Sequence, residues 1–206
     1  MWLRCGVAGC ALGLALLGSS AWAQTKGSSQ PPQRIDQWLA KLHGASQQQS
    51  FVGTFVVNIQ GQVSSSKIWH ACDAQRQVER IETLTGSPRI TYRNDDQVIT
   101  VVPEREWVWV ERREALRRFP DVLRSPALTT SKHYQVKPLP GGRVAGKDAV
   151  AAQIEPLDGL RFAYRIWTDK TSGLVLQMQT LGPGAHVLEQ VAFTELQYTP
   201  QLTTQG

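Results

Sequence analysis

Apolar and polar residues alternate with a period of two along most of the chain, which is typical of β-strands that bury one face. Short segments rich in glycine, proline, asparagine and aspartate separate the alternating stretches. We expect strands over residues 51–60, 65–72, 77–85, 89–93, 97–102, 107–111, 133–139, 143–155, 161–168, 174–181 and 186–197. We also expect a turn at residues 140–142 and an interruption at residues 146–148.

Residues 161–181, "RFAYRIWTDKTSGLVLQMQTL", show this pattern most clearly. Phe162, Tyr164 and Ile166 point to one side of an extended chain. Between the two strands, Asp169 begins a turn and Gly173 supplies a positive φ. The pattern therefore predicts a hairpin in which Asp169 forms a turn and has no catalytic role.

One segment has helical periodicity instead. Ile35, Trp38, Leu39 and Leu42 are spaced i, i+3, i+4 and i+7, so they form one apolar stripe. Gly44 is the expected stop of this helix.

The fold class that follows is mainly β (α+β). About ten strands joined mostly by short turns predict an antiparallel meander, which is either a barrel or one strongly curved sheet packed on a helix. Residues 111–124 break the pattern with many charges and Pro120, and we expect a loop with short helical turns there.

The N-terminus is typical of export. Residues 1–23 combine Arg4, an apolar run and an Ala-Trp-Ala cleavage site, as in a cleavable signal peptide. Residues 24–34 are a polar, flexible linker, and residues 201–206 are a short tail. Cleavage leaves a single cysteine, Cys72, which is either buried and inert or paired with another chain.

The sequence contains no recognisable catalytic or cofactor motif. His70 and Cys72 share one strand face, but no second pair completes a metal site. We find no phosphate-binding glycine loop and no paired carboxylates for acid–base chemistry. Nucleic acid is an improbable partner, because aromatic residues are not interleaved with a basic stripe. We therefore expect a non-enzymatic binding protein without cofactor or metal.

Two groups of residues are candidates for binding. The large side chains that would line a cavity or its rim, if they are not simply core, are Trp69, Trp107, Trp109 and Trp167. The arginines that would meet an acidic peptide or anionic head groups, if they are not simply a solvated loop, are Arg112, Arg113, Arg117 and Arg118.

Several long phrases resemble the N-terminal domain of the MucB/RseB family, in the same order along the chain. They are "IDQWLAKLHGASQQQSFVGTFVVNIQGQVSSSKIWH", "QVERIETLTGSPRITYRNDDQVITVVPE" and "GGRVAGKDAVAAQIEPLDGLRFAYRIWTDKTSGLVLQMQTLGPGAHVLEQVAFTELQ". The resemblance implies one domain over residues 35–200, an unclosed, LolA/LolB-like β-barrel with few helices around an apolar cavity. Residues 103–130 match the family pattern less well than their flanks.

The resemblance also implies a function in the envelope stress response. A member of this family is a periplasmic negative regulator, peripheral to the inner membrane at most. It binds the periplasmic part of an anti-sigma factor (MucA/RseA type), shields it from site-1 proteolysis, and senses lipid or lipopolysaccharide through its cavity. The alternative is a LolA-like carrier of lipoproteins or lipids. Family members carry a second, C-terminal domain, which we do not expect in these 206 residues.

Overall fold

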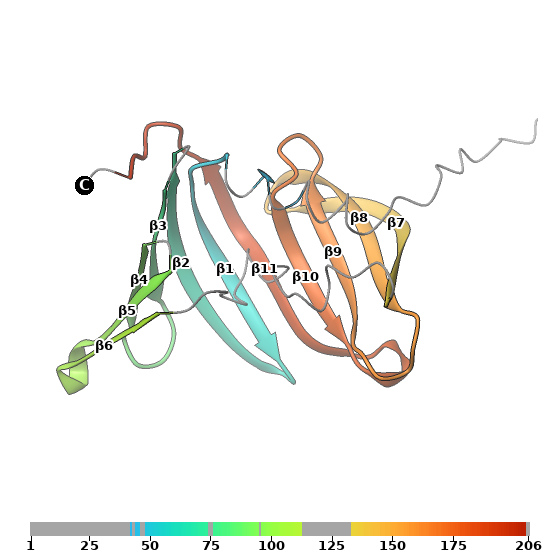
Figure 1. Ribbon diagram of the computed structural model, residues 1–206, viewed down its shortest axis with the longest axis horizontal. Helices are drawn as coiled ribbons and strands as arrows, with labels where there is room; N and C mark the ends of the chain where they lie inside the picture. The colour runs from blue at the N-terminus through green and yellow to red at the C-terminus, as the bar shows by residue number, and fades with distance from the viewer. Residues whose placement is uncertain are drawn as a thin grey trace, which may run out of the picture. The chain divides into compact units, whose positions relative to one another are not determined.

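The structure is a computed structural model that describes residues 42, 44–45, 48–73, 76–94, 96–112 and 133–204 (Figure 1). Eleven strands and two short 3₁₀ turns make up the regular elements of these residues. Their bounds are β1 Phe51–Ile59, β2 Gln62–Cys72, β3 Gln77–Thr83, β4 Ile90–Asn94, β5 Gln97–Val102, η1 Pro103–Arg105, β6 Trp107–Arg112, β7 Tyr134–Val144, β8 Lys147–Pro156, β9 Ala163–Asp169, β10 Val175–Leu181, η2 Pro183–Ala185 and β11 Val187–Tyr198.

All eleven strands belong to one antiparallel sheet, in the order β6-β5-β4-β3-β2-β1-β11-β10-β9-β8-β7. The first and last strands, β1 and β11, pair at the centre, whereas β6 and β7 are the two ends (Figure 1). Within the described residues the ends do not pair with each other, so the predicted unclosed sheet is confirmed. No helix in this part of the chain is long and apolar enough to cross a membrane.

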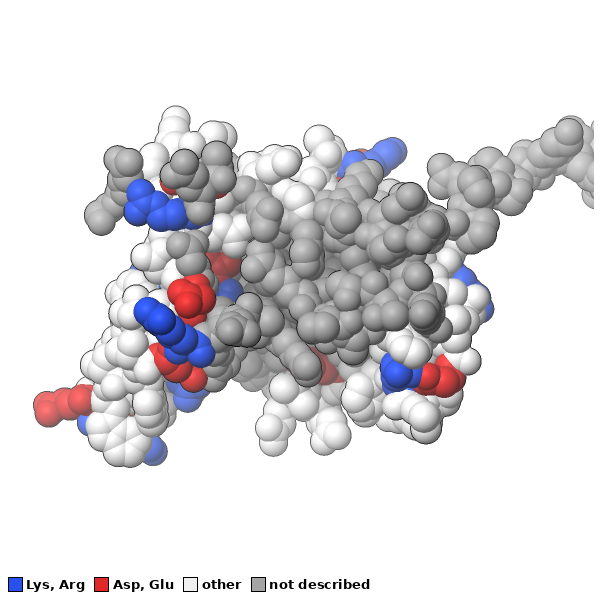
Figure 2. All heavy atoms as spheres, viewed as in Figure 1, with Lys and Arg blue, Asp and Glu red and all other residues white. Residues whose placement is uncertain are grey.

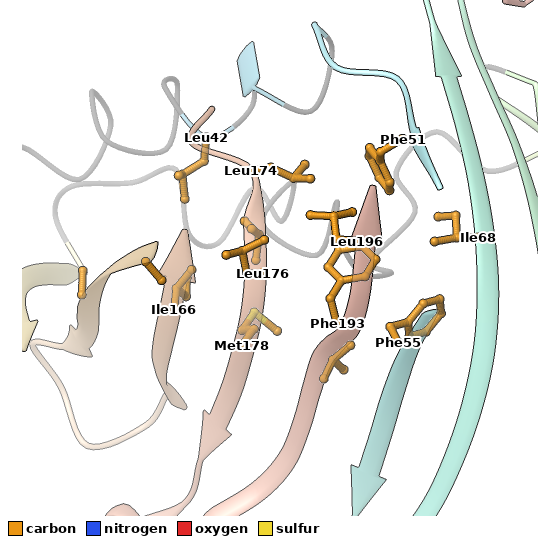
Figure 3. Close-up of a cluster of buried hydrophobic side chains, with 14 of the residues drawn as sticks. Leu42, Phe51, Phe55, Ile68, Ile166, Leu174, Leu176, Met178, Phe193 and Leu196 are labelled. Carbon is orange, nitrogen blue, oxygen red and sulfur yellow. The ribbon is translucent and has the colours of Figure 1, made fainter. Parts of the chain in front are cut away.

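The sheet buries one of its faces, which we call the core face. Residues paired directly across antiparallel strands point to the same side, so the register identifies this face on every strand. Phe51 and Phe55 of β1, Ile68 of β2 and Leu196 of β11 lie on it, each 7% exposed or less. Figure 3 shows them gathered with Met178 and Ile166 on the same side of the ribbon. The opposite side is called the outer face.

A helical segment covers part of the core face. Leu42 belongs to the buried cluster, as the predicted apolar stripe requires, although the other stripe residues lie outside the described part of the chain. The predicted stop at Gly44 is wrong, because the backbone is still helical at Gly44 and Ala45. Ala45 is buried, and its Cβ lies 3.4 Å from the point where a Cβ on Gly173 would sit. Burial of this methyl group against the β9–β10 turn favours the longer helix.

The prediction of a turn at residues 140–142 is wrong. These residues do not turn the chain, because β7 continues through them with a register shift between Leu139 and Gly142. The hairpin turn comes at Ala145 and Gly146, whose φ angles are 48° and 74°. Pro140 is tolerated within this strand because β7 is at the edge of the sheet. Gly141 allows close approach, since a Cβ there would lie 2.5 Å from the Ala149 carbonyl oxygen.

The turn between β9 and β10 is built as predicted. The Gly173 amide donates to the Asp169 carbonyl oxygen at 2.8 Å, and Gly173 has a φ of 78°. The Asp169 carboxylate accepts from the Thr171 amide at 2.8 Å and from the Tyr198 hydroxyl at 2.5 Å. Asp169 is therefore a turn former that also fastens the end of β11.

Gly53 is the tightest point of the central β1–β11 pairing. A Cβ at this position would lie 2.7 Å from the Phe193 ring and 2.8 Å from the Glu195 carbonyl oxygen. We expect Gly53→Ala to lower the free energy of unfolding by about 1–3 kcal/mol, measured by urea denaturation.

Gly142→Ala is the matched control, because nothing lies within 4 Å of its added methyl group. That variant is expected to stay within about 0.5 kcal/mol of the parent protein. Equal stabilities of the two variants would contradict the packing described for the core face.

Candidate functional site

Three charged side chains cross the core face in a line, and we call them the buried ionic row. His70 of β2 pairs in register with Glu79 of β3, which pairs with Arg93 of β4. They are only 1%, 4% and 4% exposed. Direct pairing on adjacent strands brings side chains within contact distance, so the register alone places the carboxylate between two basic groups.

Glu79 joins the two basic residues through its two oxygens. His70 Nδ1 lies 2.8 Å from Glu79 Oε1, and Arg93 Nη1 donates to Glu79 Oε2. On its other side the His70 ring stacks on Phe51, with centroids 4.7 Å apart and planes inclined by 14°. The row is thus fixed by both hydrogen bonds and packing.

These contacts set the charges of the row. Burial acts to lower the pKa of His70, but hydrogen bonds to Cys72 and Glu79 and the charge of Glu79 together raise this pKa to about 9. Burial acts to raise the pKa of Glu79, but the His70 hydrogen bond and the Arg93 charge hold it below its ordinary value. Near pH 7 the row therefore carries two cations and one anion.

Arg93 has unused hydrogen-bonding capacity. Its Nε and Nη2 atoms are buried, and neither has a hydrogen-bond partner among the described residues. A buried donor without a partner costs about 1–3 kcal/mol, and more for a charged group, so this guanidinium is a notable exception to normal polar satisfaction.

The register separates the four candidate tryptophans into two pairs. Trp107 and Trp109 of β6 pair with Val102 and Thr100 and therefore lie on the core face. They are about half exposed, at 49% and 52%, and their rings contact edge to face with centroids 5.4 Å apart.

Trp69 and Trp167 lie on the outer face. Trp69 is held between Lys67 and Arg80, whose charged groups are 5.0 Å and 4.5 Å from the ring centroid. Trp167 is partly buried, is in register with Ala151 of β8, and packs against the buried hydrophobic cluster. Of the four candidates, the register places Trp107 and Trp109 on the core face.

Arg112 ends β6, is exposed, and pairs with Gln97 on the outer face. Arg113, Arg117 and Arg118 lie outside the described residues, so the basic rim stays a prediction. In the view of Figure 2, the described lysines and arginines lie among aspartates and glutamates and form no patch of one sign.

The described residues contain no group of three or more histidines, cysteines and acids that could hold a metal ion. Cys72 is free and partly buried, with its sulfur 3.9 Å from the Ser50 hydroxyl. The buried ionic row was not predicted from the sequence. The signal in the sequence was that Glu79 lies two residues before Ile81, and therefore on the same face of the strand, which is the core face.

The pKa of His70 makes a testable contribution to stability. Because this pKa rises from 6.5 in the unfolded chain to about 9 in the folded one, the contribution is complete below pH 6.5 and is lost as pH rises through 9. We expect the free energy of unfolding to fall by on the order of 3 kcal/mol over this range. Urea denaturation at several pH values, compared with His70→Gln, isolates the effect, since glutamine does not titrate. If the free energy of unfolding of the two proteins had the same pH dependence, the His70 imidazolium would not be the source of the stabilisation.

Comparisons with known proteins identify relatives of this chain. The family model for the MucB/RseB N-terminal domain matches residues 34–206. The sigma factor AlgU regulatory protein MucB of Pseudomonas aeruginosa is 29% identical over 160 residues, which cover 77% of this chain and 49% of that protein. The sigma-E factor regulatory protein RseB of Haemophilus influenzae is 26% identical over 180 residues, covering 87% and 55%. The chain thus spans about half the length of these curated relatives.

Solved structures agree with the sequence relationship. The crystal structure of MucB in complex with MucA(peri) has a TM-score of 0.66 and 26% identity, over 82% of this chain and 57% of that one. A conserved protein from Thermus thermophilus shares the fold alone, with a TM-score of 0.57 at 13% identity. The expected family resemblance is confirmed, and the chain belongs to the MucB/RseB N-terminal domain family.

Proposed function

We propose that this chain is the sensing part of a non-enzymatic, periplasmic regulator that binds the periplasmic region of an anti-sigma factor of the MucA/RseA type. The observation that carries the proposal is its likeness to MucB solved in complex with MucA(peri), which extends over 82% of the chain. Both curated relatives are named as regulatory proteins of sigma factors, which agrees with a binding function and not with catalysis.

The open sheet supports a docking function in physical terms. β6 and β7 each pair with one neighbour among the described strands, so each has one edge whose backbone groups are not used by another described strand. Such an edge accepts an extended peptide as an additional strand. A protease also needs an extended substrate, so a segment held in this way is withheld from site-1 cleavage.

The core face supports a second role, the sensing of lipid. Most large apolar side chains of this face are buried, but Trp107 and Trp109 are half exposed at its β6 end. Uncovered aromatic surface beside a buried apolar cluster is suited to an acyl chain, with about 0.8 kcal/mol gained per buried CH₂ group. We propose that lipid or lipopolysaccharide bound there releases the anti-sigma factor.

The docking proposal is tested by protease protection. The purified protein is mixed with the periplasmic region of a MucA-type anti-sigma factor and the site-1 protease, and cleavage is followed over time. We expect cleavage to slow in proportion to the bound fraction, and lipopolysaccharide to restore the rate. A cleavage rate that is independent of the protein would reject the regulator and favour the lipid-carrier alternative.

The sensing proposal is tested at the two half-exposed tryptophans. We expect the double variant Trp107→Ser/Trp109→Ser to keep its protective effect but to need at least tenfold more lipopolysaccharide for release, because each ring contributes apolar contact area. Trp69→Ser, on the outer face, is the matched control and should respond like the parent protein. An identical response of all three proteins would remove the core face as the lipid site.

A further inference from the structure

Arg93 presents a complete anion-binding edge that no residue in the described part of the chain uses. The Nε–H and Nη2–H bonds of a guanidinium point to the same side, and this pair of donors matches the two oxygens of a carboxylate or phosphate. In Arg93 these two atoms are buried without a hydrogen-bond partner, while Nη1 at the other edge binds Glu79. The side chain is therefore held in place by one contact and open for another.

The local charge also favours an anion. Glu79 is the carboxylate bonded to both His70 and Arg93, so the buried ionic row has one positive charge in excess. On the core face of strands β2–β6, the other titratable groups are Cys72, beside His70, and Glu111, two strands from Arg93 and engaged in an interaction of its own. Two strand spacings amount to about 10 Å, and neither group bonds the free edge of Arg93. An excess buried charge is costly unless it is paired.

The surroundings of Arg93 are apolar. Its cross-strand neighbour on β5 is Val98, which is 3% exposed, and Ile81 lies on the same face of β3. Toward the β6 end of the same face lie Trp107 and Trp109, the half-exposed pair. A ligand that satisfies all of these groups has one oxyanion and a long apolar part.

We propose that Arg93 recognises the oxyanion of an anionic, single-chain amphiphile, a fatty carboxylate or an alkyl phosphate, whose chain lies along Trp107 and Trp109. This inference rests on the proposed lipid-sensing function and assigns the residue that selects the head group. Because Nε and Nη2 are buried, the packing over Arg93 shifts when the oxyanion enters. Neutral amphiphiles use the tryptophans but leave the guanidinium edge unpaired.

The test is isothermal titration calorimetry on the purified protein with four probes. Dodecanoate and dodecyl phosphate carry the oxyanion, dodecyl maltoside has the same chain with a neutral head, and acetate represents the head group alone. We expect the two anionic amphiphiles to bind at least tenfold more tightly than dodecyl maltoside. Arg93→Lys keeps a cation opposite Glu79 but lacks the two-donor edge, and should lose this tenfold preference.

Arg80→Lys is the matched control, because Arg80 lies on the outer face of the neighbouring strand β3, in register with Trp69. It should bind all probes like the parent protein. If Arg93→Lys fails to fold, the Nε–H resonance of Arg93 in the parent protein replaces it as the readout, and this resonance should shift on addition of dodecanoate. A resonance that does not move would overturn the proposal.

The remaining outcomes separate this inference from the proposed function. Equal binding of all three dodecyl compounds would overturn the role of Arg93 but leave lipid sensing intact. No binding of any of them would reject both. If acetate bound as tightly as dodecanoate, the site would be one for a free anion, and the proposed recognition of an amphiphile would be overturned.

Discussion

The register of β1 against β11 is the constraint on which the rest of the structure depends. These two strands are the first and the last of the sheet in sequence but adjacent at its centre, so their pairing joins two halves that are otherwise connected only in chain order. Side chains alternate with a period of two, and a slip by one residue would move Phe51 and Phe55 from the core face to the outer face. Every other strand inherits its orientation from this pair.

The buried ionic row adds a second constraint on register. A buried ion pair contributes little net stability compared with apolar residues of similar volume, because desolvation offsets much of the attraction. Its effect is on alternatives: a shift of β3 by two residues would keep Glu79 on the core face but take it out of direct pairing with His70 and Arg93. Unpaired burial of that carboxylate costs several kcal/mol. The row thus specifies one arrangement of the strands on which Arg93 is presented.

Much of the fold was predictable because period-two alternation is a local signal. The hairpin around Asp169 and Gly173 was also predictable, because few conformations other than a turn need these residues. The β7 bulge at Gly141 was not predictable, since the close approach of the Ala149 carbonyl depends on how β8 is registered against β7, which the alternation of apolar and polar residues does not give. The faces of Trp107 and Trp109 were equally hidden: they alternate with Val108 and Val110, so both faces of β6 are apolar. Arg93 lies on the same strand face as Thr91, and a threonine in the sequence does not indicate that this face is buried.

The same strand geometry links the two proposed binding events. β6 presents Trp107 and Trp109 to the core face, and it is also one end of the described sheet. An amphiphile would contact the core-face side chains of β6, whereas a peptide strand added at that edge would contact the backbone of the same strand. A ligand shifts a partner's binding only through a difference in its affinity for the two states. A displacement of the β6 backbone by an acyl chain would supply such a difference, because strand addition needs a straight edge with regularly spaced backbone donors.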